Sequence, residues 1–174
     1  MLMEFIRTLF FYFIVYSFLG WIIEGVFNLC TRGHFIKENF LFLPLKPMYG
    51  IAAILLISLK AFVPFWLFLI GAFIIPTLVE YFTAFILYHN LNLKYWDYSH
   101  CKYQVSGYIC LRFSLYWVIL SLALIYGLHP YIVILYNTVY GLWYYFFPII
   151  LPIFITDFIL TLRFHRTHLV HSRA

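Results

Sequence analysis

Charged residues are scarce in this chain of 174 residues. Asp, Glu, Lys and Arg make up 10% of it, and the whole stretch between Arg112 and Asp157 contains none of them. Soluble domains carry about 25% charged residues, and a membrane-spanning helix needs only ~20 apolar ones. The composition therefore excludes an ordinary soluble domain and predicts a protein that crosses a membrane several times.

The sequence also lacks the signatures of several enzyme classes. It has no P-loop, dinucleotide-binding, H-E-x-x-H or G-x-S-x-G motif, and its three cysteines show no C-x-x-C spacing. We expect no cofactor and no metal, and a non-enzyme is favoured although an enzyme is not excluded. No Pro/Gly/Ser-rich linker divides the chain, so residues 1–174 are predicted to form a single integral membrane domain.

Long unbroken apolar runs are what the chain does contain. They do not alternate apolar with polar residues, which favours helices over a membrane barrel. The N-terminal run lacks a small-residue cleavage site, so we expect it to be kept as the first span. The fold class is thus an all-α, polytopic transmembrane helix bundle. Its candidate spans are 8–29, 47–63, 64–88, 106–128, 130–147 and 148–163, with breaks at His129-Pro130 and Pro148.

The basic residues set an expected orientation. They gather in the segments 30–46 and 89–105 and in the C-terminal tail, where they suit anionic lipid better than nucleic acid. Five crossings place these three segments on one side, whereas six divide the charge equally. The positive-inside rule then predicts that the N-terminus lies outside the membrane and the C-terminus in the cytoplasm. The segment 130–147 becomes an interfacial or re-entrant helix, and six spans are the alternative.

Four single charges lie inside the apolar runs: Glu24, Glu80, Arg112 and Asp157. An ionised side chain in hydrocarbon costs at least ~3 kcal/mol, so it normally faces a protein interior or an aqueous cavity. In the five-span topology each lies ~9–12 Å from the cytoplasmic end of its helix. One interpretation is a shared substrate or ion pathway. The other is an Arg–carboxylate pair that fixes how the helices pack.

Further polar positions accompany these charges. Trp21 and Asn28 share one face of the first span with Glu24. Tyr49 follows the stiff Pro44-x-x-Pro47 segment and precedes a glycine. The segment that comprises Trp96, Asp97, Tyr98 and Ser99 is either an interfacial anchor with a capping carboxylate or a lid over the charges.

Five separated motifs, in order, resemble one family. They are Tyr16-Ser17-Phe18-Leu19-Gly20-Trp21 with Glu24, Pro44-x-x-Pro47-Met48-Tyr49-Gly50, Glu80-Tyr81, Trp96-Asp97-Tyr98-Ser99, and Gly107-x-Ile109-Cys110-Leu111 with Ser114 and Trp117. They are similar to the bacterial membrane proteins described as "putative ABC-transporter type IV", or CmpB-like. The chain has Glu38-Asn39 where that family usually has Arg-Gly, and Tyr108 where it has Arg. Lys46 and Arg112 are then the cations left to balance the acids.

The resemblance implies a membrane, permease-like component of a transporter in the bacterial inner membrane. Its expected partners are the lipid bilayer, a separate ATP-binding subunit, an unidentified small molecule or ion, and other copies of the chain in an oligomer. An alternative is a membrane-embedded enzyme that acts on a lipid or lipid-linked substrate, with Glu24 or Asp97 as acid or base. A third is an accessory or scaffold subunit whose charges only specify helix pairing.

Overall fold

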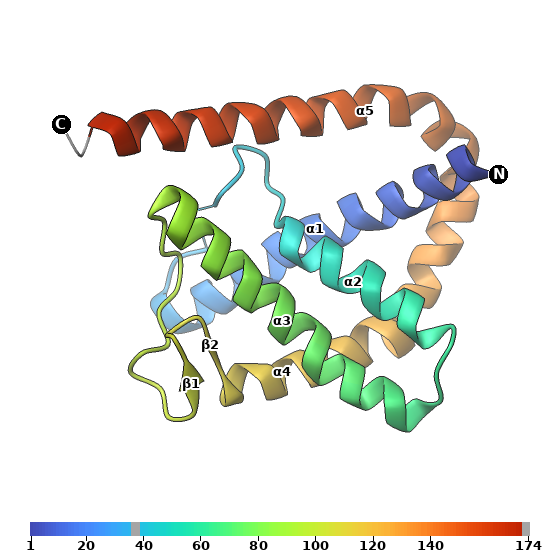
Figure 1. Cartoon of the computed structure of the whole chain (residues 1–174). Helices are drawn as coiled ribbons and strands as arrows, with labels where there is room; N and C mark the ends of the chain where they lie inside the picture. Colours follow the sequence, from blue (N-terminus) through green and yellow to red (C-terminus); the bar gives the residue numbers. More distant parts are fainter. Residues whose placement is uncertain (36–38, 172–174) are drawn as a thin grey trace. The chain divides into compact units, whose positions relative to one another are not determined.

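The computed structural model describes residues 1–35 and 39–171, with side chains to residue 167. Its elements in chain order are α1 (Leu2–Arg32), α2 (Pro47–Lys60), α3 (Phe65–Leu91), β1 (Gln104–Val105), β2 (Ile109–Cys110), α4 (Leu111–Leu122), the π-helix η1 (Ala123–Leu128) and α5 (His129–His171) (Figure 1). The expected helical class is confirmed, apart from the two short antiparallel strands.

Three apolar stretches are long enough to cross a membrane: Leu2–Arg32, Phe65–Leu91 and the continuous helical run Leu111–Thr167. Helices suit a bilayer because they satisfy their own backbone hydrogen bonds. The fourth apolar helix, α2, has 14 residues and measures about 21 Å, shorter than the ~30 Å hydrocarbon core. The chain is therefore a helical membrane protein, and five against six crossings stays a prediction.

The expected breaks at His129-Pro130 and at Pro148 are wrong. The helix α5 continues through Pro130, Pro148 and Pro152, and Figure 1 shows it changing direction within its first half. Each proline removes one backbone donor and bends a helix, but membrane helices tolerate that loss by local π or 3₁₀ adjustment. The π-helix η1 lies directly before Pro130.

The boundaries of α2 and α3 lie within three residues of expectation, whereas α1 begins six residues earlier than expected and α5 ends eight residues later. The span expected from residue 106 begins at Leu111, because residues 104–110 form a hairpin. The turn of this hairpin contains Ser106 and Gly107, both with positive φ. Helix α1 ends where Gly33, at φ 78°, donates its N–H to Leu29 at 3.0 Å.

The chain forms two compact units whose boundaries fall inside α2 and α5. The first comprises residues 1–50 and 135–174, and the second comprises residues 51–134. In the first, Phe11 of α1 packs against Tyr136 and Trp143 of α5. In the second, α3 packs against α4, and the buried Leu56, Phe68, Ala72 and Ile125 form a hydrophobic cluster.

Glycines bring α1 close to the start of α2 in the first unit. A Cβ on Gly50 would lie 2.6 Å from the backbone oxygen of Phe13, and a Cβ on Gly20 would lie 2.2 Å from Cγ of Tyr49. Small residues permit this close approach of membrane helices. The contact fixes the start of α2, which directly follows the described residues 39–46 and the polar groups that they carry.

Candidate functional site

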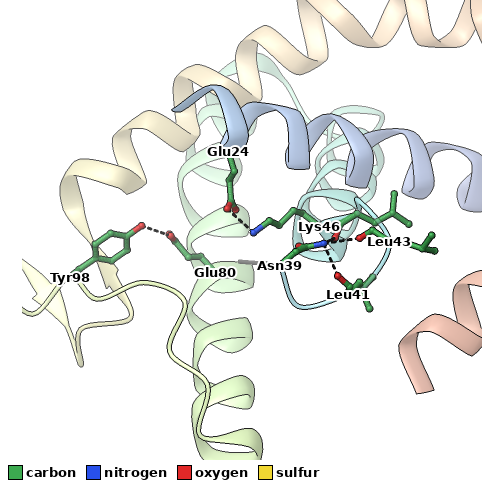
Figure 2. Close-up of polar contacts among 8 residues, drawn as sticks. Glu24, Asn39, Leu41, Leu43, Lys46, Glu80 and Tyr98 are labelled. Atoms are coloured by element: carbon green, nitrogen blue, oxygen red, sulfur yellow. Dashed lines mark hydrogen bonds and ion pairs between the residues drawn. The ribbon is translucent and has the colours of Figure 1, made fainter. Parts of the chain in front are cut away.

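Glu80 on α3 is the centre of the polar site in the second unit. Its side chain is 4% exposed, and both carboxylate oxygens accept hydrogen bonds. Tyr98 donates its hydroxyl to Oε1 at 3.0 Å (Figure 2), and Trp117 of α4 donates its indole N–H to Oε2 at 2.9 Å. Hydrogen bonds to a charged group contribute about 1.5–3 kcal/mol each, so these donors stabilise the carboxylate where water is largely excluded.

The segment before the hairpin positions Tyr98. The backbone N–H of Tyr98 donates to the carbonyl of Gly107 at 2.9 Å, and the indole of Trp96 donates to the carbonyl of Tyr108 at 2.8 Å. The Tyr98 ring stacks on Phe113 of α4, with centroids 4.7 Å apart. The hairpin and α4 therefore both hold Tyr98, whose hydroxyl reaches Glu80.

Asp97 organises the same segment from its exposed side. It accepts a hydrogen bond from Lys94 at 2.6 Å and one from the backbone N–H of Ser99 at 2.9 Å. These contacts, the lysine first, hold the pKa of Asp97 well below its usual range. The carboxylate therefore closes a turn over residues 97–99, and Ser99 is exposed. The choice between an anchor and a lid stays a prediction.

Arg112 makes no ion pair with the acids of its unit among the described residues. It is exposed near the start of α4, and its Nε donates to the hydroxyl of Tyr116 at 3.1 Å. Within the part of the chain that the structure describes, Lys46 and Lys94 make the ion pairs with the predicted site acids. A long cationic side chain near a helix end extends toward the polar interface, which accounts for this exposed position.

Glu24 of α1 and Lys46 form an ion pair in the first unit, with Nζ and Oε2 2.8 Å apart (Figure 2). The side chains are 17% and 11% exposed, respectively. The backbone N–H of Lys46 also donates to the carbonyl of Ser17 at 2.9 Å. Lys46 and Arg112 were the two cations expected from the family resemblance to balance the acids, and Lys46 is the one that pairs with Glu24.

Asn39 organises the segment that carries Lys46. Its amide nitrogen donates toward the carbonyls of Leu41, Leu43 and Leu45 at 3.0, 2.7 and 3.2 Å (Figure 2). Three acceptors around one NH₂ group curl residues 39–46 into a compact turn. Asp157 of α5 is 8% exposed, and its Oδ2 accepts the N–H of Leu43 at 3.3 Å.

The remaining predicted positions have packing roles in the first unit. Trp21 contacts the rings of Phe18 and Phe35. Asn28 is buried and donates to the carbonyl of His34 at 2.8 Å. The ring of Tyr49 lies against Gly20.

The structure therefore gives two polar sites, one in each unit. Glu24 and Asp157 both contact the segment 39–46 of the first unit, whereas Glu80 and Arg112 belong to the second. A single layer that contains all four charges stays a prediction. Sequence reasoning did not assign roles at the site to Trp117 and Asn39. The signal for Trp117 was an indole, which needs a hydrogen-bond partner, within an apolar span.

The Cys101 and Cys110 thiols lie together at the hairpin, although their sequence separation gave no motif. They share a hydrogen bond, and partial burial followed by this bond raises the pKa of Cys101. Cys110 is 1% exposed. Among the described residues, no group of three or more His, Cys, Asp or Glu side chains could hold a metal ion.

All of these side chains fall inside one family match. The family described as "Putative ABC-transporter type IV" matches residues 11–162. The chain belongs to this family. The match confirms the resemblance carried by the five motifs and extends past Asp157. Comparison with curated proteins and with solved structures finds no significant match.

Proposed function

We propose that the chain is the membrane, permease-like component of a transporter whose ATP-binding subunit is a separate chain. Membership of an ABC-transporter-type family and the long apolar helices support this function. The sequence contains no P-loop motif, so ATP hydrolysis is assigned to a partner.

The observation that carries the proposal is the buried Glu80 with its two donors. An acid inside an apolar helix is costly and normally marks a substrate or ion pathway. Tyr98 and Trp117 hold its carboxylate in one orientation. The Glu24–Lys46 pair and Asp157 supply further polar groups in the first unit. We place all of these groups along the route of a polar substrate.

The proposed topology is that of a bacterial inner-membrane protein with five crossings and a cytoplasmic C-terminus. Helix α5 has 43 residues and would be about 65 Å long if straight, twice the ~30 Å hydrocarbon core. It therefore supplies both the last crossing and an interfacial or re-entrant part. A reporter fused after residue 174 should be active in the cytoplasm, and an external reporter would contradict this topology.

The test uses the full chain, purified in mild detergent from the membranes of the cells that naturally produce it. We expect a chain with a P-loop to co-purify in fixed ratio and the complex to hydrolyse ATP with vanadate sensitivity. The variant Glu80→Gln should retain the partner and change the rate of ATP hydrolysis. The control Glu4→Gln, at the exposed start of α1, should retain the partner and leave the rate unchanged. Absence of both the partner and the hydrolysis would overturn the proposal.

A further inference from the structure

Three uncharged side-chain oxygens of the first unit are buried without a hydrogen-bond partner in the described structure. They are Oγ of Ser17 on α1, Oγ1 of Thr161 on α5 and Oδ1 of Asn39, and the last two lie on elements that contact each other. Thr161 is 0% exposed. An unmade hydrogen bond at a buried polar atom is unfavourable and rare in folded proteins, so such an atom indicates a ligand or a functional role.

Thr161 faces the segment 39–46. Asp157, Thr161 and His165 follow one another at one-turn intervals along the same face of α5. Asp157 accepts the N–H of Leu43, and the His165 ring stacks on Phe40 with centroids 5.6 Å apart. Since the residues one turn before and one turn after Thr161 both contact this segment, the buried hydroxyl lies at the same contact.

The Asn39 oxygen is a genuine oxygen and not an interchanged nitrogen. Its partner atom Nδ2 is surrounded by carbonyl acceptors, which only the NH₂ end of the amide can satisfy. Leu43 connects the two groups, because its N–H donates to Asp157 and its carbonyl accepts from Asn39. Asp157 and Asn39 are thus linked through Leu43, and we infer that Thr161, one turn from Asp157, lies at the same contact between α5 and the segment.

The acidic group at this contact is the carboxylate of Asp157. Among the described residues, the donor to the buried Asp157 is one backbone N–H at 3.3 Å, which is long for a bond to a carboxylate. Lys46, the cation of the described part of the segment, pairs with Glu24. Oxygen ligands suit hard cations, and a single carboxylate balances one positive charge. A divalent ion usually takes more oxygen ligands, often with several carboxylates among them.

We propose that Asp157, Thr161 and Asn39 form a binding site for a small alkali cation, with Na⁺ as the probe. The carboxylate supplies the compensating charge, and the hydroxyl and amide oxygens complete the ligand set. This binding is a property of the first unit and does not depend on the proposed ATP-driven function. Binding also gives the buried oxygens of Thr161 and Asn39 a partner.

The test uses the full chain in lipid nanodiscs, with thermal unfolding measured in NaCl and in choline chloride at equal ionic strength. A ligand that binds only the folded state raises Tm in a saturable way. We expect a rise of several degrees with Na⁺ that choline does not give. Equal Tm values in the two salts would overturn the site.

Three variants locate the effect. Thr161→Val keeps the shape of the side chain but removes the oxygen, and should abolish the Na⁺-dependent rise. Thr161→Ser keeps the oxygen and should retain the Na⁺-dependent rise. It therefore keeps the site testable even if the third variant, Asp157→Asn, fails to fold. The matched control is Thr77→Val in the second unit, whose hydroxyl donates to the carbonyl of Phe73. Its Na⁺ response should equal that of the wild type. A rise that survives in Thr161→Val would overturn the assignment.

The outcome is separable from the transporter proposal. Saturable ²²Na⁺ binding to the purified chain, lost in Thr161→Val, supports the cation site even if no ATP-binding partner is found. An ATP-hydrolysing complex whose chain binds no ²²Na⁺ supports the transporter and removes the cation site.

Discussion

Trp117 donates its indole N–H to Oε2 of Glu80, at 2.9 Å, from α4 to α3. The bond joins two adjacent helices at a point where one of them carries a buried acid. Tyr98 holds the other oxygen of the same carboxylate. The orientation of Glu80 is therefore set by side chains from two different elements, and removing either donor should have a measurable effect.

Trp117→Phe removes the donor and keeps most of the ring. We expect a loss of about 1.5–3 kcal/mol of stability, because a buried carboxylate loses one charge-assisted bond. Thermal or denaturant unfolding in detergent measures it. In the background of Glu80→Leu, which has no acceptor, the same substitution should cost much less. The matched control is Trp66→Phe, at a tryptophan that is 74% exposed. An equal loss for Trp117→Phe in the wild-type and in the Glu80→Leu background would mean that ring packing, and not the bond to Glu80, is responsible.

Gly50→Ala tests the close approach of α2 to α1. The added Cβ would lie 2.6 Å from the backbone oxygen of Phe13, and backbone cannot move aside as a flexible side chain can. We expect a loss of stability of about 1–3 kcal/mol from overpacking. Gly141→Ala on α5 is the control, because a Cβ there meets nothing within 4 Å. Alanine should stabilise that helix by up to about 1 kcal/mol. Opposite signs for the two variants support the contact, whereas the same sign would contradict it.

The Glu24–Lys46 pair is mostly shielded from water, so removing one partner leaves the other charge unmatched. Both Glu24→Gln and Lys46→Met should be destabilising, by about 3–5 kcal/mol for a fully buried pair and less for this one. The double variant should recover part of that loss. Unfolding of the four proteins gives the coupling energy. Strictly additive losses would show that the 2.8 Å contact contributes nothing.

The long helices followed from composition, because apolar runs in a bilayer have almost no alternative to helix. Lys46 was identified as a candidate counter-charge because few cations lie near the acids. The helix through Pro130 and Pro148 was missed, since a local rule for proline ignores the π-helix η1 and the neighbouring contacts that accommodate it. The arrangement of donors around Glu80 was missed for another reason. It depends on contacts made over 18 and 37 residues of sequence, for which periodicity gives no signal.

Asn39→Asp changes little in shape but replaces an NH₂ donor with an oxygen. That oxygen would face three carbonyl oxygens, which now accept from the amide at 2.7–3.2 Å. We expect a larger loss of stability than in Asn39→Ala, because repulsion adds to the unsatisfied acceptors. Asn92→Asp, at an exposed position with φ 51°, controls for the added charge. Limited proteolysis of segment 39–46 measures the local effect, and equal cleavage of the Asp and Ala variants would contradict the expected repulsion.

The thiol of Cys101 should react slowly with iodoacetamide near neutral pH. Only the thiolate reacts, and partial burial and the hydrogen bond with Cys110 raise the pKa of Cys101. A higher pKa means less thiolate at a given pH, so the rate should keep increasing at pH values above those where an ordinary thiol levels off. Cys110→Ala removes one of the two causes of the raised pKa and should speed alkylation of Cys101 at pH 8. At high pH, where the Cys101 thiol is ionised in both proteins, the alkylation rates with and without Cys110 should converge. Cys30→Ala as the common background leaves Cys101 as the reactive site, because Cys110 is buried. Identical pH–rate profiles with and without Cys110 would contradict the bond between the two thiols.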